Sequence, residues 1–74
     1  MKLGIYQHCK GKLYKVLLLA KDTETLEEMV VYECLYENPQ GQFWTRNKLM
    51  FEEKILIDNK EVQRFTFIRP SVDI

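Results

Sequence analysis

The sequence predicts an all-β domain of 74 residues. Apolar residues show poor helical periodicity along the whole chain, whereas runs of β-branched and aromatic residues recur between turn-forming residues. No repeat, linker or low-complexity tract divides the chain. We therefore expect one domain over residues 1–74, with a compact part over about 5–68 and a tail over 69–74.

Three strands are expected in the first half of the chain, over residues 5–8, 13–22 and 28–36. Gly11 supports a turn between the first two strands. Pro39 and Gly41 end the third strand, because proline and glycine both favour turns. The second and third strands are expected to form one long hairpin.

Three more strands are expected over residues 42–46, 53–57 and 62–68. The segment 47–51 is too short for a stable α-helix and suits one 3₁₀ turn. Asp58, Asn59 and Lys60 predict a tight turn, since asparagine tolerates a positive φ. Five to six short antiparallel strands with a single 3₁₀ turn predict a small, partly open SH3-like barrel.

The long hairpin has two faces of different character. Placing the apolar side of each strand on one face pairs Tyr14 with Tyr36 and Ala20 with Val30, and puts Cys34 in the core. The opposite face then carries an apolar stripe, the candidate self-association surface: Leu17, Leu19, Met29, Val31 and Leu35. A monomer would cover the stripe with the first strand or the tail, which we favour, and a homodimer would bury it between two copies.

Composition and charge restrict the class of function. Lysine plus arginine and aspartate plus glutamate number 11 each, so the chain lacks the net positive charge that attracts nucleic acid over long range. No apolar run has the length of a signal peptide or a membrane span, which indicates a cytoplasmic protein without a membrane partner. The two cysteines form no Cys-x-x-Cys pair, so we expect reduced thiols, no metal and no cofactor.

Groups suited to catalysis are few. A nucleophilic mechanism needs a serine, cysteine or threonine beside a base. The only serine, Ser71, lies in the expected tail, the only histidine, His8, flanks a turn, and Cys34 is assigned to the core. Neighbouring glutamates at positions 24, 27 and 28 and at 52 and 53 lie in expected surface loops, where nothing separates acid and base roles. We therefore expect that the chain is not an enzyme.

The segment GQFWTRNKLMF, residues 41–51, holds the only tryptophan. Phe43 and Trp44 must point to opposite faces of a strand. Because the polar residues Gln42 and Arg46 share a face with Trp44, we expect Trp44 to point outward and Phe43 to point into the core. A tryptophan beside an arginine on a sheet surface is typical of a binding hot spot.

Two hypotheses for function follow. The first is a non-enzymatic module that binds a protein or peptide partner, with the candidate binding residues Trp44, Arg46, Glu24, Thr25 and Arg64. The second is a nucleic-acid-binding barrel that uses Lys2, Lys10, Lys12 and Lys15. It ranks below the first because the acidic third strand opposes phosphate. A purely structural alternative packs Trp44 under a loop or the tail, with Arg46 stacked on it or paired with Glu24 or Glu27.

Four stretches of the chain carry a family resemblance. They are KGKLYKVLLLAKDTETLEEMVVYECLY, FWTR, MFEEKI and VQRF. From about Tyr6 to Phe65 the chain resembles the bacterial family called domain of unknown function 1653. The resemblance implies a compact, stand-alone bacterial domain and brings no activity with it. Asp22 stands where the family pattern has a histidine, so any chemistry of that histidine is not expected here.

Overall fold

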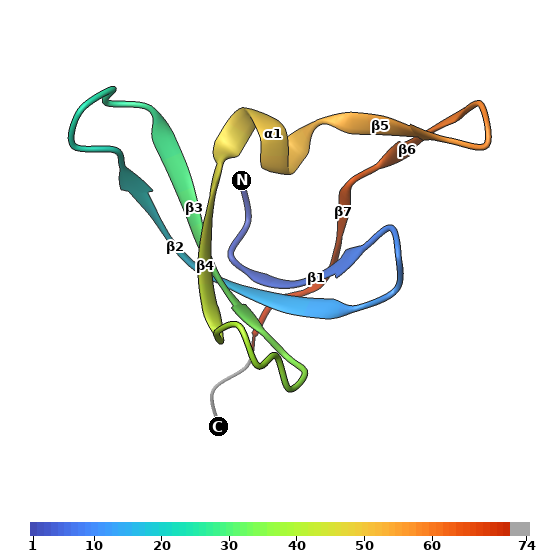
Figure 1. The fold of residues 1–74 in the computed structure, drawn as a ribbon, viewed down its shortest axis with the longest axis horizontal. Coiled ribbons are helices and arrows are strands. Elements are labelled where there is room, and N and C mark those ends of the chain that lie inside the picture. Colours follow the sequence, from blue (N-terminus) through green and yellow to red (C-terminus); the bar gives the residue numbers. More distant parts are fainter. Residues whose placement is uncertain (72–74) are drawn as a thin grey trace.

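The computed structural model describes residues 1–71. Over this range the chain forms seven strands and one short helix. A five-stranded antiparallel sheet has the order β4-β3-β2-β1-β7, and β5 and β6 form a separate hairpin (Figure 1). The sheet is strongly twisted but has two free edges, β4 and β7, so it is open and does not close into a barrel. The expectation of an all-β fold is confirmed.

The first three strands follow the predicted order. They are β1 (Gly4–His8), β2 (Leu13–Lys21) and β3 (Glu28–Cys34). The predicted register of β2 against β3 is wrong, because Tyr14 lies opposite Cys34 and the register shifts again between Val16 and Leu18. A two-residue slip leaves every side chain on the same face, so the apolar pattern cannot detect it, and the bulge at Leu17 has no signature in the sequence.

The bulge changes the outer face of the sheet. Beyond it, Leu19 lies opposite the fully buried Val30 and therefore shares the inner face, while Leu18 lies opposite Val31 on the outer face. The predicted stripe is thus broken: Leu19 leaves it and Leu17 falls in the bulge.

Cover of the outer face by the first strand is also wrong, because β1 pairs beside β2 within the same sheet. The other segment expected to cover this face is the tail, residues 69–74. Its last part, residues 72–74, lies outside the described residues. Met29 and Val31 keep the outer face, now with Leu18. Leu35 follows the end of β3 and is exposed. Self-association through this face stays a prediction.

The segment after β4 (Phe43–Asn47) is a short α-helix rather than the expected 3₁₀ turn. This helix, α1 (Lys48–Glu52), is capped by Asn47, whose side-chain oxygen accepts hydrogen bonds from the backbone N–H groups of Leu49 and Met50. Capping satisfies two of the donors that a helix start leaves free, which stabilises even a single turn. The helix buries Phe51 completely.

The predicted sixth strand is two strands in different sheets. They are β6 (Lys60–Gln63), which pairs with β5 (Lys54–Ile57), and β7 (Phe65–Arg69), which pairs with β1. The chain changes partner at Arg64, whose backbone N–H donates to Glu53 and whose carbonyl accepts from Cys9. The predicted turn at Asp58 and Asn59 is confirmed, and both residues have a positive φ.

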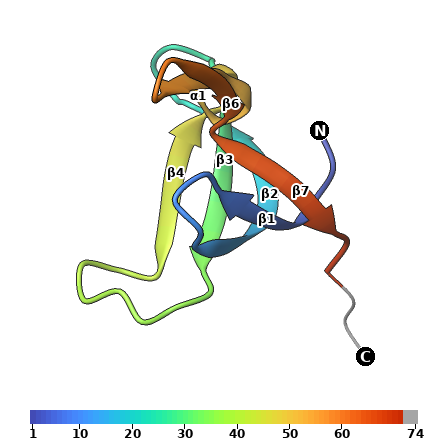
Figure 2. The same ribbon diagram turned by 90° about the vertical axis from the view of Figure 1, so that its right-hand side faces the viewer.

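The core lies on the inner, concave side of the sheet, beneath α1 (Figures 1 and 2). Its buried members are Tyr6, Val16, Val30, Tyr32, Phe51 and Phe65. Phe51 and Phe65 stack with ring centroids 4.0 Å apart. Cys34 is buried, as predicted. Within residues 1–71 no helix is long and apolar enough to cross a membrane.

Candidate functional site

Trp44 and Arg46 point toward the inner face of the sheet, which corrects the sequence-based assignment. On β4, Trp44 lies opposite Tyr32 and Arg46 opposite Val30, and both partners are buried on the inner face. Phe43, expected in the core, lies opposite Glu33 on the outer face and is 61% exposed. The ladder with β3 decides which way a side chain points, and the polarity of neighbours on the same strand does not.

These two side chains line one cavity of about 230 Å³. Its walls come from β2, from β3 and the residues after it, and from β4, and they consist of Tyr14, Tyr32, Cys34, Tyr36, Asn38, Gln40, Trp44 and Arg46. We call this cavity the Arg46 pocket. Its lining combines aromatic rings and neutral polar groups with one permanently charged side chain, so it can hold a small group that carries a single negative charge.

Arg46 is the unusual member of this lining. Its guanidinium carbon lies 5.8 Å from the centroid of the Phe65 ring, and its Nε is buried without a hydrogen-bond partner. Among residues 1–71, no carboxylate pairs with Arg46. Arg46 as a whole is half-buried, so its Nε is shielded from water while the rest of the side chain reaches the pocket. A shielded polar atom without a partner costs free energy.

Two tyrosine hydroxyls in the pocket lining contact each other. The hydroxyls of Tyr14 and Tyr36 lie 3.0 Å apart, in hydrogen-bond contact. The hydrogen bonds to Tyr14 and to Cys34, followed by burial, raise the pKa of Tyr36 above its ordinary value of 10.0. The Tyr36 hydroxyl therefore stays neutral. The Lys12 ammonium lies 4.1 Å from the Tyr36 ring centroid and adds positive potential beside the Arg46 pocket.

The loop between β3 and β4 holds Trp44 in place. The indole N–H donates to the Gly41 carbonyl over 3.0 Å. Gly41 has φ of +141°, a backbone conformation in the range that favours glycine. The structural alternative is thus correct in part, since Trp44 packs against this loop, yet 36% of it remains exposed.

His8 lies on the same aromatic surface. Its ring centroid is 4.9 Å from that of Phe65 and 6.4 Å from that of Tyr14. Burial, with smaller contributions from the charges of Arg46, Arg64 and Lys10, lowers the pKa of His8 below its ordinary value of 6.5. The positive charges of Arg46, Arg64 and Lys10 are thus close enough to act on His8.

The other predicted binding residues lie elsewhere. Glu24 and Thr25 belong to the loop between β2 and β3, at the opposite end of β3 from the Arg46 pocket (Figure 1). Their backbone N–H groups donate to the Asp22 carboxylate, which lowers the pKa of Asp22. Arg64 has internal partners, the Glu53 carboxylate and the Met50 carbonyl, and joins α1 to the strands that follow. The structure therefore unites Trp44 with Arg46 and separates them from the remaining three.

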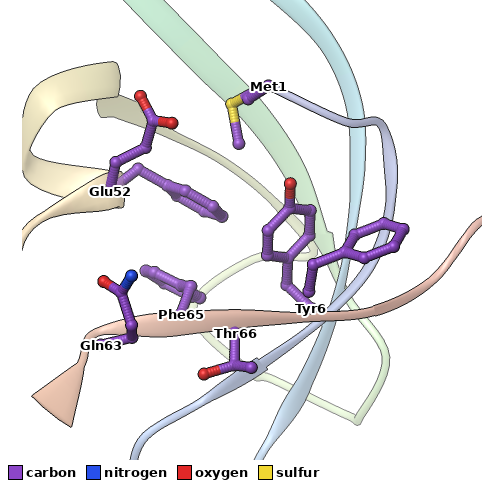
Figure 3. Close-up of a pocket in the computed structure, with 8 residues that line it drawn as sticks. Met1, Tyr6, Glu52, Gln63, Phe65 and Thr66 are labelled. Atoms are coloured by element: carbon purple, nitrogen blue, oxygen red, sulfur yellow. The ribbon is translucent and has the colours of Figure 1, made fainter.

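A second cavity of about 250 Å³ opens between β1, α1 and β7 (Figure 3). Its rings come from Tyr6, Phe51, Phe65 and Phe67, and Glu52 lies at its margin. The Tyr6 hydroxyl already donates to the Lys2 carbonyl over 2.6 Å. This second cavity thus shows no unsatisfied group comparable to Arg46. Within residues 1–71 no cluster of three or more histidine, cysteine, aspartate or glutamate side chains could hold a metal ion.

Sequence reasoning missed most of the Arg46 pocket. The apolar pattern places Tyr14 and Cys34 on the core face and does not single out Tyr32, Asn38 or Gln40. One signal was available, because β3 and β4 are joined by a loop and a hairpin register places Trp44 beside Tyr32. To derive that register, the residue at which β3 ends must be known. β3 ends two residues earlier than predicted.

Comparisons with known proteins assign the family. No curated protein matches the chain. A crystal structure of a DUF1653 protein from Bordetella bronchiseptica is similar over 100% of this chain and 95% of that one, with a TM-score of 0.89 and 30% sequence identity. The family described as protein of unknown function (DUF1653) matches residues 4–67. The resemblance noted from the sequence is confirmed, and the chain belongs to the DUF1653 family.

Proposed function

We propose that the chain is a non-enzymatic interaction module that receives a protein or peptide partner at the Arg46 pocket. The observation that carries the proposal is the meeting of Trp44 with an Arg46 that lacks an ionic partner among residues 1–71. Partly exposed tryptophan supplies apolar contact area, and arginine supplies a directional charge, which is the pair most enriched at binding hot spots. The SH3-like type of fold, which suits such a role, stays a prediction.

The local chemistry of the thiols and of the histidine supports a non-catalytic role. The Cys9 sulfur lies 3.6 Å from His8 Nδ1, but the same nitrogen accepts the backbone N–H of Lys10. The lone pair that would activate the thiol is therefore already engaged. Cys34 is buried, and the side-chain amide of Asn38 donates to its sulfur.

Affinity capture from cell extract with immobilised protein tests the proposal. Wild type is expected to recover a partner that the double variant Trp44→Ala/Arg46→Ala fails to recover, with at least a tenfold loss when the purified partner is titrated. Phe43→Ala is the matched control, because it removes an exposed aromatic ring from the same strand on the outer face. Equal recovery by wild type and a folded double variant contradicts the proposal.

Nucleic acid is the alternative partner, and its basis is the lysine-rich start of the chain. The basic groups are dispersed: Lys15 lies opposite Glu33 on the outer face, whereas Lys2 and Lys12 lie over the rings of Phe67 and Tyr36. Titration with single- and double-stranded oligonucleotides at about 50 and 200 mM salt separates the two ideas, because phosphate binding weakens steeply with salt. Salt-sensitive binding that survives the double variant would favour nucleic acid.

A further inference from the structure

Resting on the proposed function, we infer that the Arg46 pocket recognises a carboxylate carried by a small group, such as the end of a peptide chain or an acidic side chain. Three features of the described residues carry this inference: the state of Arg46, the character of the walls and the size of the space.

The state of Arg46 favours a negatively charged ligand. Within residues 1–71 its guanidinium has a ring beneath it at 5.8 Å but no carboxylate, and its Nε has no acceptor. The fold provides counter-charges for other cations, since Arg64 pairs with Glu53 and Lys48 with Glu28. The terminal N–H groups of an arginine left without a counter-charge in a pocket can donate two hydrogen bonds to a ligand carboxylate.

The walls favour one negative charge over two. Among residues 1–71, Arg46 is the only charged residue that lines the Arg46 pocket, and the other polar groups are hydroxyls, amides and a thiol. A phosphate dianion would need more cations than the lining provides, whereas a carboxylate balances one guanidinium.

The size of the space limits the attached group. A volume of about 230 Å³ corresponds to roughly eight water molecules at their share of liquid volume. One amino-acid side chain or chain end fills this space. The partly exposed Trp44 ring and the ring of Tyr36 offer it apolar contact.

Fluorescence provides a direct test, because Trp44 is the only tryptophan and lines the pocket. The intact protein is titrated with N-acetyl-phenylalanine, its neutral amide, blocked glutamate, blocked glutamine and inorganic phosphate. We expect one or both carboxylates to change the Trp44 emission with a Kd of about 1 mM, as befits a ligand of this size. The neutral analogues should bind at least tenfold more weakly.

Matched variants assign the effect to Arg46. Arg46→Gln should weaken carboxylate binding at least tenfold and Arg46→Lys by less, while Arg69→Gln, which removes a charge outside the pocket lining, should change it less than twofold. Circular dichroism confirms that each variant is folded. A response to the chain-end carboxylate alone or to blocked glutamate alone supports the inference and identifies which source is bound.

Equal binding of acids and amides, tighter binding of phosphate than of either acid, or an unchanged Kd in folded Arg46→Gln would overturn the inference. No response to any carboxylate overturns it as well. The capture experiment can distinguish failure of this inference from failure of the proposed function. If a partner is recovered through Trp44 and Arg46 but contributes no carboxylate, the proposed function stands and this inference is rejected. If carboxylates bind but no partner is captured, this inference stands and the proposed function is rejected.

Discussion

At the scale of single residues, Arg46 determines the electrostatics of the inner face. Its charge acts on His8, whose pKa is lowered by burial first and then by Arg46, Arg64 and Lys10. Because the folded-state pKa lies below the ordinary value of 6.5, the unfolded chain binds more protons around that pH. The contribution of His8 to stability is therefore fully present above about pH 6.5 and is lost as the pH falls through the folded-state pKa.

A proton NMR titration of His8, the only histidine, measures this effect. We expect a pKa below 6.5 in wild type and a higher pKa in Arg46→Gln, because one repelling charge is removed. A bound carboxylate should also raise the pKa. Arg69→Gln serves as the control, since Arg69 is not among the charges that act on His8. An unchanged pKa in Arg46→Gln would show that the guanidinium lies too far away to act.

At the scale of elements, short hydrogen-bonded connections hold the strands in place. The loop between β2 and β3 closes around Asp22, whose carboxylate accepts the N–H groups of Glu24 and Thr25 and whose carbonyl accepts that of Leu26. To close the loop, Leu26 adopts a φ of 61°, a strained value for a residue with a Cβ atom. Its side chain is 67% exposed, so packing offsets little of the strain.

Leu26→Gly is therefore expected to raise the free energy of unfolding by about 0.5–1 kcal/mol. This net gain is the backbone strain that glycine relieves, minus the entropy that the more flexible glycine loses on folding. Leu26→Ala is the matched control, because it removes the exposed side chain but keeps the Cβ atom, and it should give no comparable gain. Urea denaturation followed by circular dichroism measures both variants. A loss of stability in Leu26→Gly would show that the leucine side chain itself stabilises the loop.

At the scale of the whole molecule, one aromatic cluster joins the sheet to the helix. Phe51 of α1 stacks on Phe65 of β7 and contacts Tyr6 of β1 and Tyr32 of β3. Elements from both halves of the chain thus share a single core. A domain of this size has little stability in reserve, so this contact should decide whether the molecule unfolds as one unit.

Phe51→Ala should lower the free energy of unfolding by about 3–5 kcal/mol, and Phe51→Leu by about 1–2 kcal/mol, because each leaves a cavity of different size. Leu49→Ala, on the exposed side of the same helix, should change it by less than about 0.5 kcal/mol. Trp44 fluorescence and far-ultraviolet circular dichroism should report one coincident transition in each folded variant. Separate transitions would contradict the expectation of a single cooperative domain.

Local signals in the sequence determined most of the secondary structure. Alternating apolar residues predicted β1 to β3 within one or two residues at each end, and Asp58 with Asn59 predicted a turn with positive φ. The burial of Cys34 also followed from alternation. These features depend on neighbours along the chain, so their physical cause is visible in a single sequence.

Only the tertiary structure decided which faces meet. The bulge at Leu17, the change of partner at Arg64 and the inward direction of Trp44 all depend on hydrogen bonds to another strand, which the apolar pattern of one strand does not encode. The Arg46 pocket follows from these pairings, because the β3–β4 register turns Trp44 and Arg46 toward Tyr14, Tyr32 and Tyr36. The sequence contains every residue of the candidate site, and long-range strand pairing alone brings them together.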